Sequence, residues 1–123
     1  VWIGGHGEGS KPNETIDVYN LTTGEKQSEL YMPLMPVGLA EKDDEVAVIS
    51  HGANMLYVAN TKGEVLWQQK VGANPFAATY FADYIVVAGY DDQTIYFLNE
   101  QKMVKEVQTD KGPFQLFVRE GME

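Results

Sequence analysis

The chain has 123 residues, of which 44% are hydrophobic, and this is enough for the core of one ordinary domain. It carries 18 acidic against 9 basic residues, a net charge of −9, and the basic residues are scattered. This balance argues against binding nucleic acid or an anionic membrane surface, because both need clustered lysine and arginine. Cysteine is absent, which excludes disulfides, thiolate metal sites and a cysteine nucleophile.

Membrane insertion is not predicted, because no apolar run approaches the ~20 residues that cross a bilayer. The chain begins with Val1 rather than Met and shows no signal peptide. We therefore expect a processed or truncated piece of a longer protein.

The first strand is expected at residues 1–5, and the stretch GGHGEGSKPNET that follows is the longest irregular segment of the chain. It lacks the glycine spacing, the Lys-Ser/Thr pair and the following helix of a phosphate-binding loop. One interpretation is a loop for a ligand or partner, since binding residues concentrate on loops. The other is a tolerated insertion.

An alternating apolar run leads to Asn20, and the same arrangement recurs at nearly equal intervals before Asn60 and Asn99. Alternation with a period of two is typical of a strand. We expect each asparagine to lie in the turn that follows, because asparagine tolerates turn geometry and hydrogen-bonds its own backbone. A glycine follows Asn20 and Asn60, but Lys102 takes that place in the third unit, so the third turn should differ in type.

Three prolines repeat with nearly the same period as the asparagines. Pro36, Pro75 and Pro113 are almost evenly spaced, and each precedes a short apolar strand. The middle unit shows the complete pattern, and four strands are expected there, near residues 36–40, 45–50, 55–59 and 64–71.

A period of about 40 residues with four short strands in each unit is the signature of a β-propeller blade. We therefore predict an all-β fold of three four-stranded antiparallel β-propeller blades in one domain, residues 1–123. Blade 1 would cover 1–35 plus a closing strand at 113–119, blade 2 would cover 36–74, and blade 3 would cover 75–112.

Known propellers have typically 4–8 blades. The chain is therefore expected to be a partial propeller or one half of a six-bladed assembly. Exposed blade faces and sheet edges favour association, so the expected partners include a second copy or the remaining blades of a parent chain.

The stretch LYVANTKGEVLWQQKVGANPFAA resembles a repeat of the YVTN β-propeller family. The family pattern falls on residues 57–60, on Val71-Gly72 and on Pro75, and the other two units keep only parts of it. Similar repeats occur in lactonase-type propellers, in quinoprotein amine dehydrogenase heavy chains and in bacterial surface or periplasmic proteins. The resemblance implies an extracytoplasmic location: periplasmic, cell-surface or secreted.

The segment ANTKGEVLWQ is also similar to the blade motif of pyrroloquinoline quinone proteins, in Gly63 and Trp67. That motif recurs in successive blades. Ser28 and the pair Lys105-Glu106 occupy the equivalent places here, so we predict no quinone and no other cofactor.

One face of a propeller carries the loops between the second and third strands of each blade. His6, His51 and Tyr90 follow equivalent strands of successive units, with Asp91 and Asp92 beside Tyr90. The interval from His6 to His51 is the longer of the two, because the first unit carries the longer loop. We predict that these five residues form a site for a small ligand or a protein partner. The opposite face carries simple turns and charged stretches such as EKDDE.

Two histidines and a carboxylate are also ligands that a metal ion accepts. The competing interpretation is that each histidine ends a strand and hydrogen-bonds a loop carbonyl, while Asp91-Asp92 form a hairpin turn. The histidines lack the close spacing of a metal motif, so no metal site is predicted.

No nucleophile elbow of the form G-x-S-x-G occurs. The predicted function is a non-catalytic, extracytoplasmic β-propeller module that binds a protein or ligand. The alternative is part of a propeller enzyme, lactonase-like or quinoprotein dehydrogenase-like, whose active site is completed outside this chain.

Overall fold

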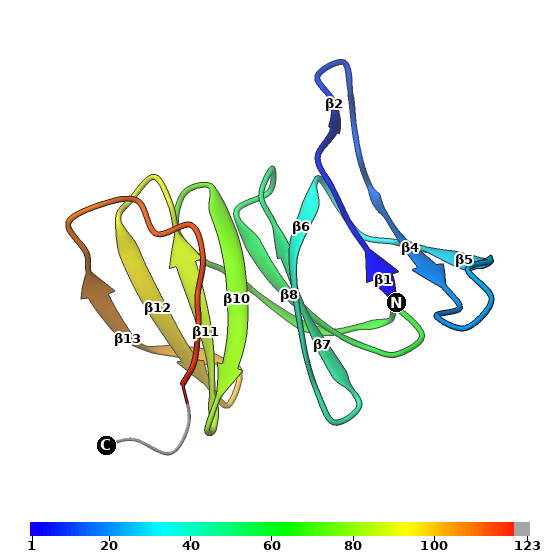
Figure 1. Cartoon of the computed structure of the whole chain (residues 1–123). Coiled ribbons are helices and arrows are strands. Elements are labelled where there is room, and N and C mark those ends of the chain that lie inside the picture. The colour runs from blue at the N-terminus through cyan, green and yellow to red at the C-terminus, as the bar shows by residue number, and fades with distance from the viewer. Residues whose placement is uncertain (120–123) are drawn as a thin grey trace.

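The computed structural model describes residues 1–119; the last four residues of the predicted domain, 120–123, lie outside the described part. Within it the chain forms thirteen strands and no helix. Accordingly, no helix that could span a membrane is found in residues 1–119. The strands build three successive antiparallel sheets and one short hairpin (Figure 1). The predicted all-β propeller fold is confirmed.

Blade 1 has three strands in the order β1-β4-β5: β1 (Trp2–Ile3), β4 (Thr15–Tyr19) and β5 (Lys26–Tyr31). The segment that was expected to be irregular forms a hairpin instead, β2 (Gly7–Glu8) and β3 (Lys11–Pro12). The hairpin projects beyond the sheets in Figure 1. Its base is closed by the Asn13 amide, which donates to the His6 carbonyl oxygen at 2.8 Å.

Blades 2 and 3 each have four strands in chain order, as the repeat predicts. Blade 2 consists of β6 (Pro36–Lys42), β7 (Glu45–Ser50), β8 (Met55–Asn60) and β9 (Val65–Lys70). Blade 3 consists of β10 (Pro75–Phe81), β11 (Tyr84–Gly89), β12 (Thr94–Asn99) and β13 (Lys102–Gln108). We call the end with residues 51–54 and 90–93 the loop end, and the end with residues 43–44, 82–83 and 100–101 the turn end.

Residues 113–119 form no strand, which corrects the predicted closing strand of blade 1. The Phe114 ring lies instead against Phe76 of β10, with ring centroids 4.8 Å apart. Figure 1 shows this segment beside blade 3 and away from β1. The physical reason is that three wedge-shaped blades do not curve far enough to bring the segment back to the first sheet.

Blade 2 lies between the other two blades and is buried on both faces. Side chains alternate across a strand, so on β7 Val46 and Val48 pack toward blade 1, while Ala47 and Ile49 pack toward blade 3. Because both faces of β7 are buried, its sequence is a continuous apolar run rather than an alternation of apolar and polar residues. Burying each valine or isoleucine contributes about 1.5–3 kcal/mol, so the two inter-blade cores hold the three sheets together.

The turns after the third strands follow the asparagine pattern. The Asn60 Oδ1 accepts a hydrogen bond from the Lys62 amide at 2.9 Å, and Asn20 makes the equivalent bond in blade 1. In blade 3 the turn is Glu100-Gln101, with φ of 52° and 67°. The predicted difference in turn type is confirmed.

Candidate functional site

Three of the predicted site residues converge at the loop end. His6 follows β1, His51 follows β7 and Tyr90 follows β11. These strands are equivalent, because β1 pairs with β4 as β7 pairs with β8 and β11 with β12. They gather around Phe76, the second residue of β10. The ring centroids are 5.1 Å apart for His6 and His51, 4.3 Å for His51 and Phe76, and 5.4 Å for Phe76 and Tyr90.

Sequence reasoning missed the two phenylalanines of this cluster. Phe76 contacts all three predicted rings, and Phe114 contacts both Phe76 and Tyr90, the latter at a centroid distance of 6.2 Å. The signal was present as a repeat, because Pro75-Phe76 and Pro113-Phe114 are the same dipeptide in successive units. By itself the dipeptide predicts only the start of a strand.

The orientation of His51 follows from one contact. Its Nδ1 lies 3.3 Å from the carbonyl oxygen of Pro75, the first residue of β10. Because a carbonyl oxygen only accepts hydrogen bonds, this contact places the imidazole proton on Nδ1. In the neutral ring Nε2 is then an acceptor. His6 is exposed; its ring is tilted by 55° to that of His51 and packs edge-to-face with that of Phe76.

The two aspartates do not join the histidines. The Asp91 carboxylate accepts from the Asn74 side-chain amide, and the Asp91 backbone amide donates to the Ala73 carbonyl oxygen at 3.1 Å. These bonds tie the β11–β12 loop to the connection between blades 2 and 3. Asp91 therefore orders the loop end beside the ring cluster.

Asp92 turns into blade 3, where its Oδ2 accepts a hydrogen bond from the Tyr96 hydroxyl. Burial, and next the hydrogen bond and charge of Asp92, raise the pKa of Tyr96 to about 12. The other carboxylate oxygen, Oδ1, is buried with no hydrogen-bond partner in the described chain. Gly72 and Gly89 flank this carboxylate, and a Cβ at either position would collide with it.

Within residues 1–119 no three His, Cys, Asp or Glu side chains lie close enough together to hold one ion. The site offers imidazole, phenol and phenyl rings instead.

A groove of about 430 Å³ runs from this cluster along the inner strands. Equivalent positions of three successive units line it, together with His6: 37–39 on β6, 76–78 on β10, and 114–115. Small side chains keep it open, because Gly38, Ala77 and Ala78 stand where larger residues would fill it. Gly38 is also required for packing, since a Cβ there would lie 2.6 Å from the Phe76 carbonyl oxygen.

The chemistry of the groove suits a flat apolar group. Its walls are aliphatic and aromatic, and His6 and Gln115 supply polar atoms at its border. Aromatic rings prefer edge-to-face or offset neighbours with centroids about 4.5–7 Å apart. Phe76, Phe114 and Tyr90 already pack in this range, and Phe114 remains 58% exposed.

No protein-family model matches the chain, and no curated protein sequence matches it. Solved structures do match. Hydrazine synthase of Kuenenia stuttgartiensis is 15% identical, with 81% of this chain and 31% of that chain covered and a TM-score of 0.74. AztD of Citrobacter koseri is 18% identical, with 92% of this chain and 35% of that chain covered and a TM-score of 0.70.

The chain thus spans about a third of the length of these structures, both of which are β-propellers. Identities this low establish the fold alone. Together with the four-stranded antiparallel sheets they show that the chain is a partial β-propeller.

Proposed function

We propose that this chain is a non-catalytic β-propeller module that binds a ligand bearing an aromatic ring at the loop end of its inner groove. The observation that carries the proposal is a cluster of five rings, His6, His51, Phe76, Tyr90 and Phe114, three of which also line a groove with small side chains. The three that line the groove are His6, Phe76 and Phe114. A ring entering the groove would meet Phe114, whose face is half free, and the border atoms of His6 and Gln115.

We also propose that the blades are YVTN-type repeats and that the protein is located outside the cytoplasm. Both rest on the resemblance of residues 56–78 to the repeats of that family. The ring could belong to a small ligand or to an aromatic side chain of a protein partner, because the groove would recognise the aromatic ring in both.

Chemical-shift mapping by NMR with N-acetyl-tryptophanamide as probe tests this proposal. The amides of Phe76, Ala77 and Ala78 are expected to shift, while N-acetyl-alaninamide, which lacks the ring, leaves them in place. Phe114→Ala should weaken binding. Phe117→Ala is the matched control, because Phe117 lies in the same segment, is 89% exposed and does not line the groove.

Equal shifts with both probes, or equal losses in both variants, would contradict the proposed site. Because Phe114 and Phe117 both lie outside the strands, neither substitution should unfold the chain.

We further infer that additional blades cover the open faces of this module, supplied by a parent chain or a second copy. Apolar side chains on the outer blades support this inference, since Ile3 is 51% and Val104 is 46% exposed. Solution mass measurement tests the second-copy version. A clean 13.7 kDa monomer at high concentration would exclude it.

A further inference from the structure

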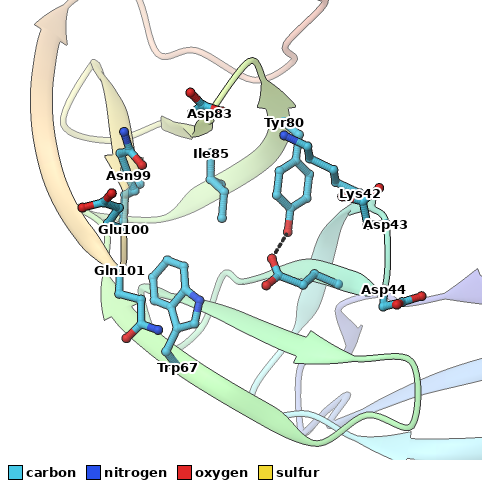
Figure 2. A pocket seen from close by; sticks show the side chains of 12 residues that line it. Lys42, Asp43, Asp44, Trp67, Tyr80, Asp83, Ile85, Asn99, Glu100 and Gln101 are labelled. Carbon is cyan, nitrogen blue, oxygen red and sulfur yellow. Dashed lines mark hydrogen bonds between the residues drawn. The ribbon is translucent and has the colours of Figure 1, made fainter.

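A second cleft lies at the turn end, away from the ring cluster. It has a volume of about 800 Å³ and opens between blades 2 and 3 (Figure 2). Three two-residue turns surround it: 43–44 between β6 and β7, 82–83 between β10 and β11, and 100–101 between β12 and β13. The sequence predicted simple turns and charged stretches such as EKDDE at this end, and no site.

The floor of the cleft is apolar and aromatic. Ile85 and Leu98 reach it from the core between blades 2 and 3, and both are nearly inaccessible to solvent. Trp67, on the outer strand β9, packs against the same core and presents its indole to the cleft (Figure 2). Tyr80 stands opposite, on the inner strand β10.

The Tyr80 hydroxyl donates to the Glu45 carboxylate at 3.4 Å, the bond drawn in Figure 2. Burial, and secondarily the charge of Glu45, raise the pKa of Tyr80 well above its ordinary value. The hydrogen bond orients the Glu45 carboxylate beside the floor of the cleft.

The rim is strongly acidic, and its carboxylates form no ion pair within residues 1–119. It carries five carboxylates against one ammonium: Asp43, Asp44, Glu45, Asp83 and Glu100 against Lys42. The Lys42 Nζ donates to the Ala82 carbonyl oxygen at 2.8 Å and so is occupied by a turn. The ion pairs found within residues 1–119 both belong to Lys26, in blade 1, and none involves the rim.

We propose that this cleft binds a basic segment of a protein partner, with an arginine side chain lying on the floor between Trp67 and Tyr80. Aromatic faces attract a cation within about 6 Å, and tryptophan does so best. The methylene stem of arginine matches the Ile85 and Leu98 surface. A planar guanidinium both stacks on rings and pairs with carboxylates.

The distribution of the carboxylates favours a segment with several positive charges over a single small cation. They come from three separate turns around the cleft, so one ion cannot meet all of them. Exposed ion pairs each contribute about 0.2–1 kcal/mol, and several of them together with one desolvated cation give useful affinity. This site is independent of the ring-binding groove at the loop end.

Fluorescence titration with triarginine amide tests the proposal. A Trp2→Phe background leaves Trp67 as the single tryptophan, so its emission reports on the cleft. Triarginine is expected to change this emission saturably, and the affinity should fall as ionic strength rises from about 10 mM to about 150 mM, where the screening length shortens from about 30 Å to about 8 Å. Tricitrulline amide, which has nearly the same shape without the charge, should not bind.

Two charge-matched variants separate the cleft from the general acidity of the chain. Neutralising four rim carboxylates should weaken binding at least about tenfold: Asp43→Asn, Asp44→Asn, Asp83→Asn and Glu100→Gln. The control neutralises four exposed carboxylates elsewhere and should change the affinity less than about twofold: Glu8→Gln, Glu25→Gln, Glu106→Gln and Asp110→Asn.

Equal weakening in the two variants would assign the binding to net charge and overturn the proposal. Equal binding of tricitrulline, or an unchanged Trp67 emission at saturating triarginine, would overturn it as well. None of these outcomes tests ring binding at the loop-end groove, so the two proposals are tested independently.

Discussion

The His51 imidazole packs on the Phe76 ring with centroids 4.3 Å apart and planes inclined by 32°. The two residues belong to different blades, since His51 follows β7 and Phe76 lies in β10. The contact joins the loop of one blade to the inner strand of the next, and His6 and Tyr90 also contact the same phenylalanine. The cluster therefore connects two blades, and its His6, Phe76 and Phe114 also line the groove.

Phe76→Ala should destabilise the chain by about 2–3 kcal/mol, because it removes a half-buried ring that four other rings contact. Urea unfolding measures the loss. Phe117→Ala, at a residue 89% exposed, should change stability by less than about 0.5 kcal/mol. Similar losses at the two positions would show that the cluster does not join the blades.

Gly38→Ala should cost about 1–3 kcal/mol, because the added methyl would lie 2.6 Å from the Phe76 carbonyl oxygen and 3.1 Å from the Ile49 Cβ. Both neighbours belong to packed strands and have little freedom to move. Gly9→Ala, in the β2–β3 turn, meets nothing within 4 Å and should be close to neutral. The pair is compared by thermal unfolding, and a neutral Gly38→Ala would refute the close approach of β6 and β10.

Unfolding free energy should fall as pH rises from about 10 toward about 12. The pKa of Tyr96 is raised from 10.0 to about 12 in the folded chain. The folded state therefore holds the phenol proton more tightly, so the stabilisation is complete below the unfolded pKa and is lost through the folded one. Tyr96→Phe should make this decline shallower.

The measurement is the urea midpoint across this pH range for both proteins. Identical slopes would show that Tyr96 titrates as it does in the unfolded chain. At neutral pH, Tyr96→Phe should also destabilise by about 1–3 kcal/mol, because the buried Asp92 carboxylate loses its donor.

Asn60→Ala should destabilise by about 1 kcal/mol, because the Asn60 Oδ1 accepts from two backbone amides, those of Lys62 and Glu64. Asn99→Ala provides the control. Asn99 occupies the equivalent place in blade 3, where the two-residue turn makes no such bonds within residues 1–119, and its loss should stay under about 0.5 kcal/mol. Chemical denaturation of both variants makes the comparison, and equal losses would refute the turn assignment.

The sequence alone determined the architecture of the blades. The proline, asparagine and histidine or tyrosine landmarks repeat at nearly constant spacing, and period-two alternation places the strands between them. Both are local properties of the chain, so the strands of blade 2 fall where they were expected. The repeat also predicts that His6, His51 and Tyr90 lie together at the loop end. They follow equivalent strands of successive blades, and equivalent loops lie at the same end of a propeller.

Only the tertiary structure decided what surrounds those residues. Phe76 lies at the centre of the rings, Asp92 turns into blade 3 toward Tyr96, and Phe114 packs on blade 3 rather than joining blade 1. The acidic cleft over Trp67 likewise depends on the packing of two blades, because residues of both blade 2 and blade 3 line it. Strand identity is set by neighbours along the chain, whereas the distances between blades depend on how two buried cores pack, and no local pattern records that packing.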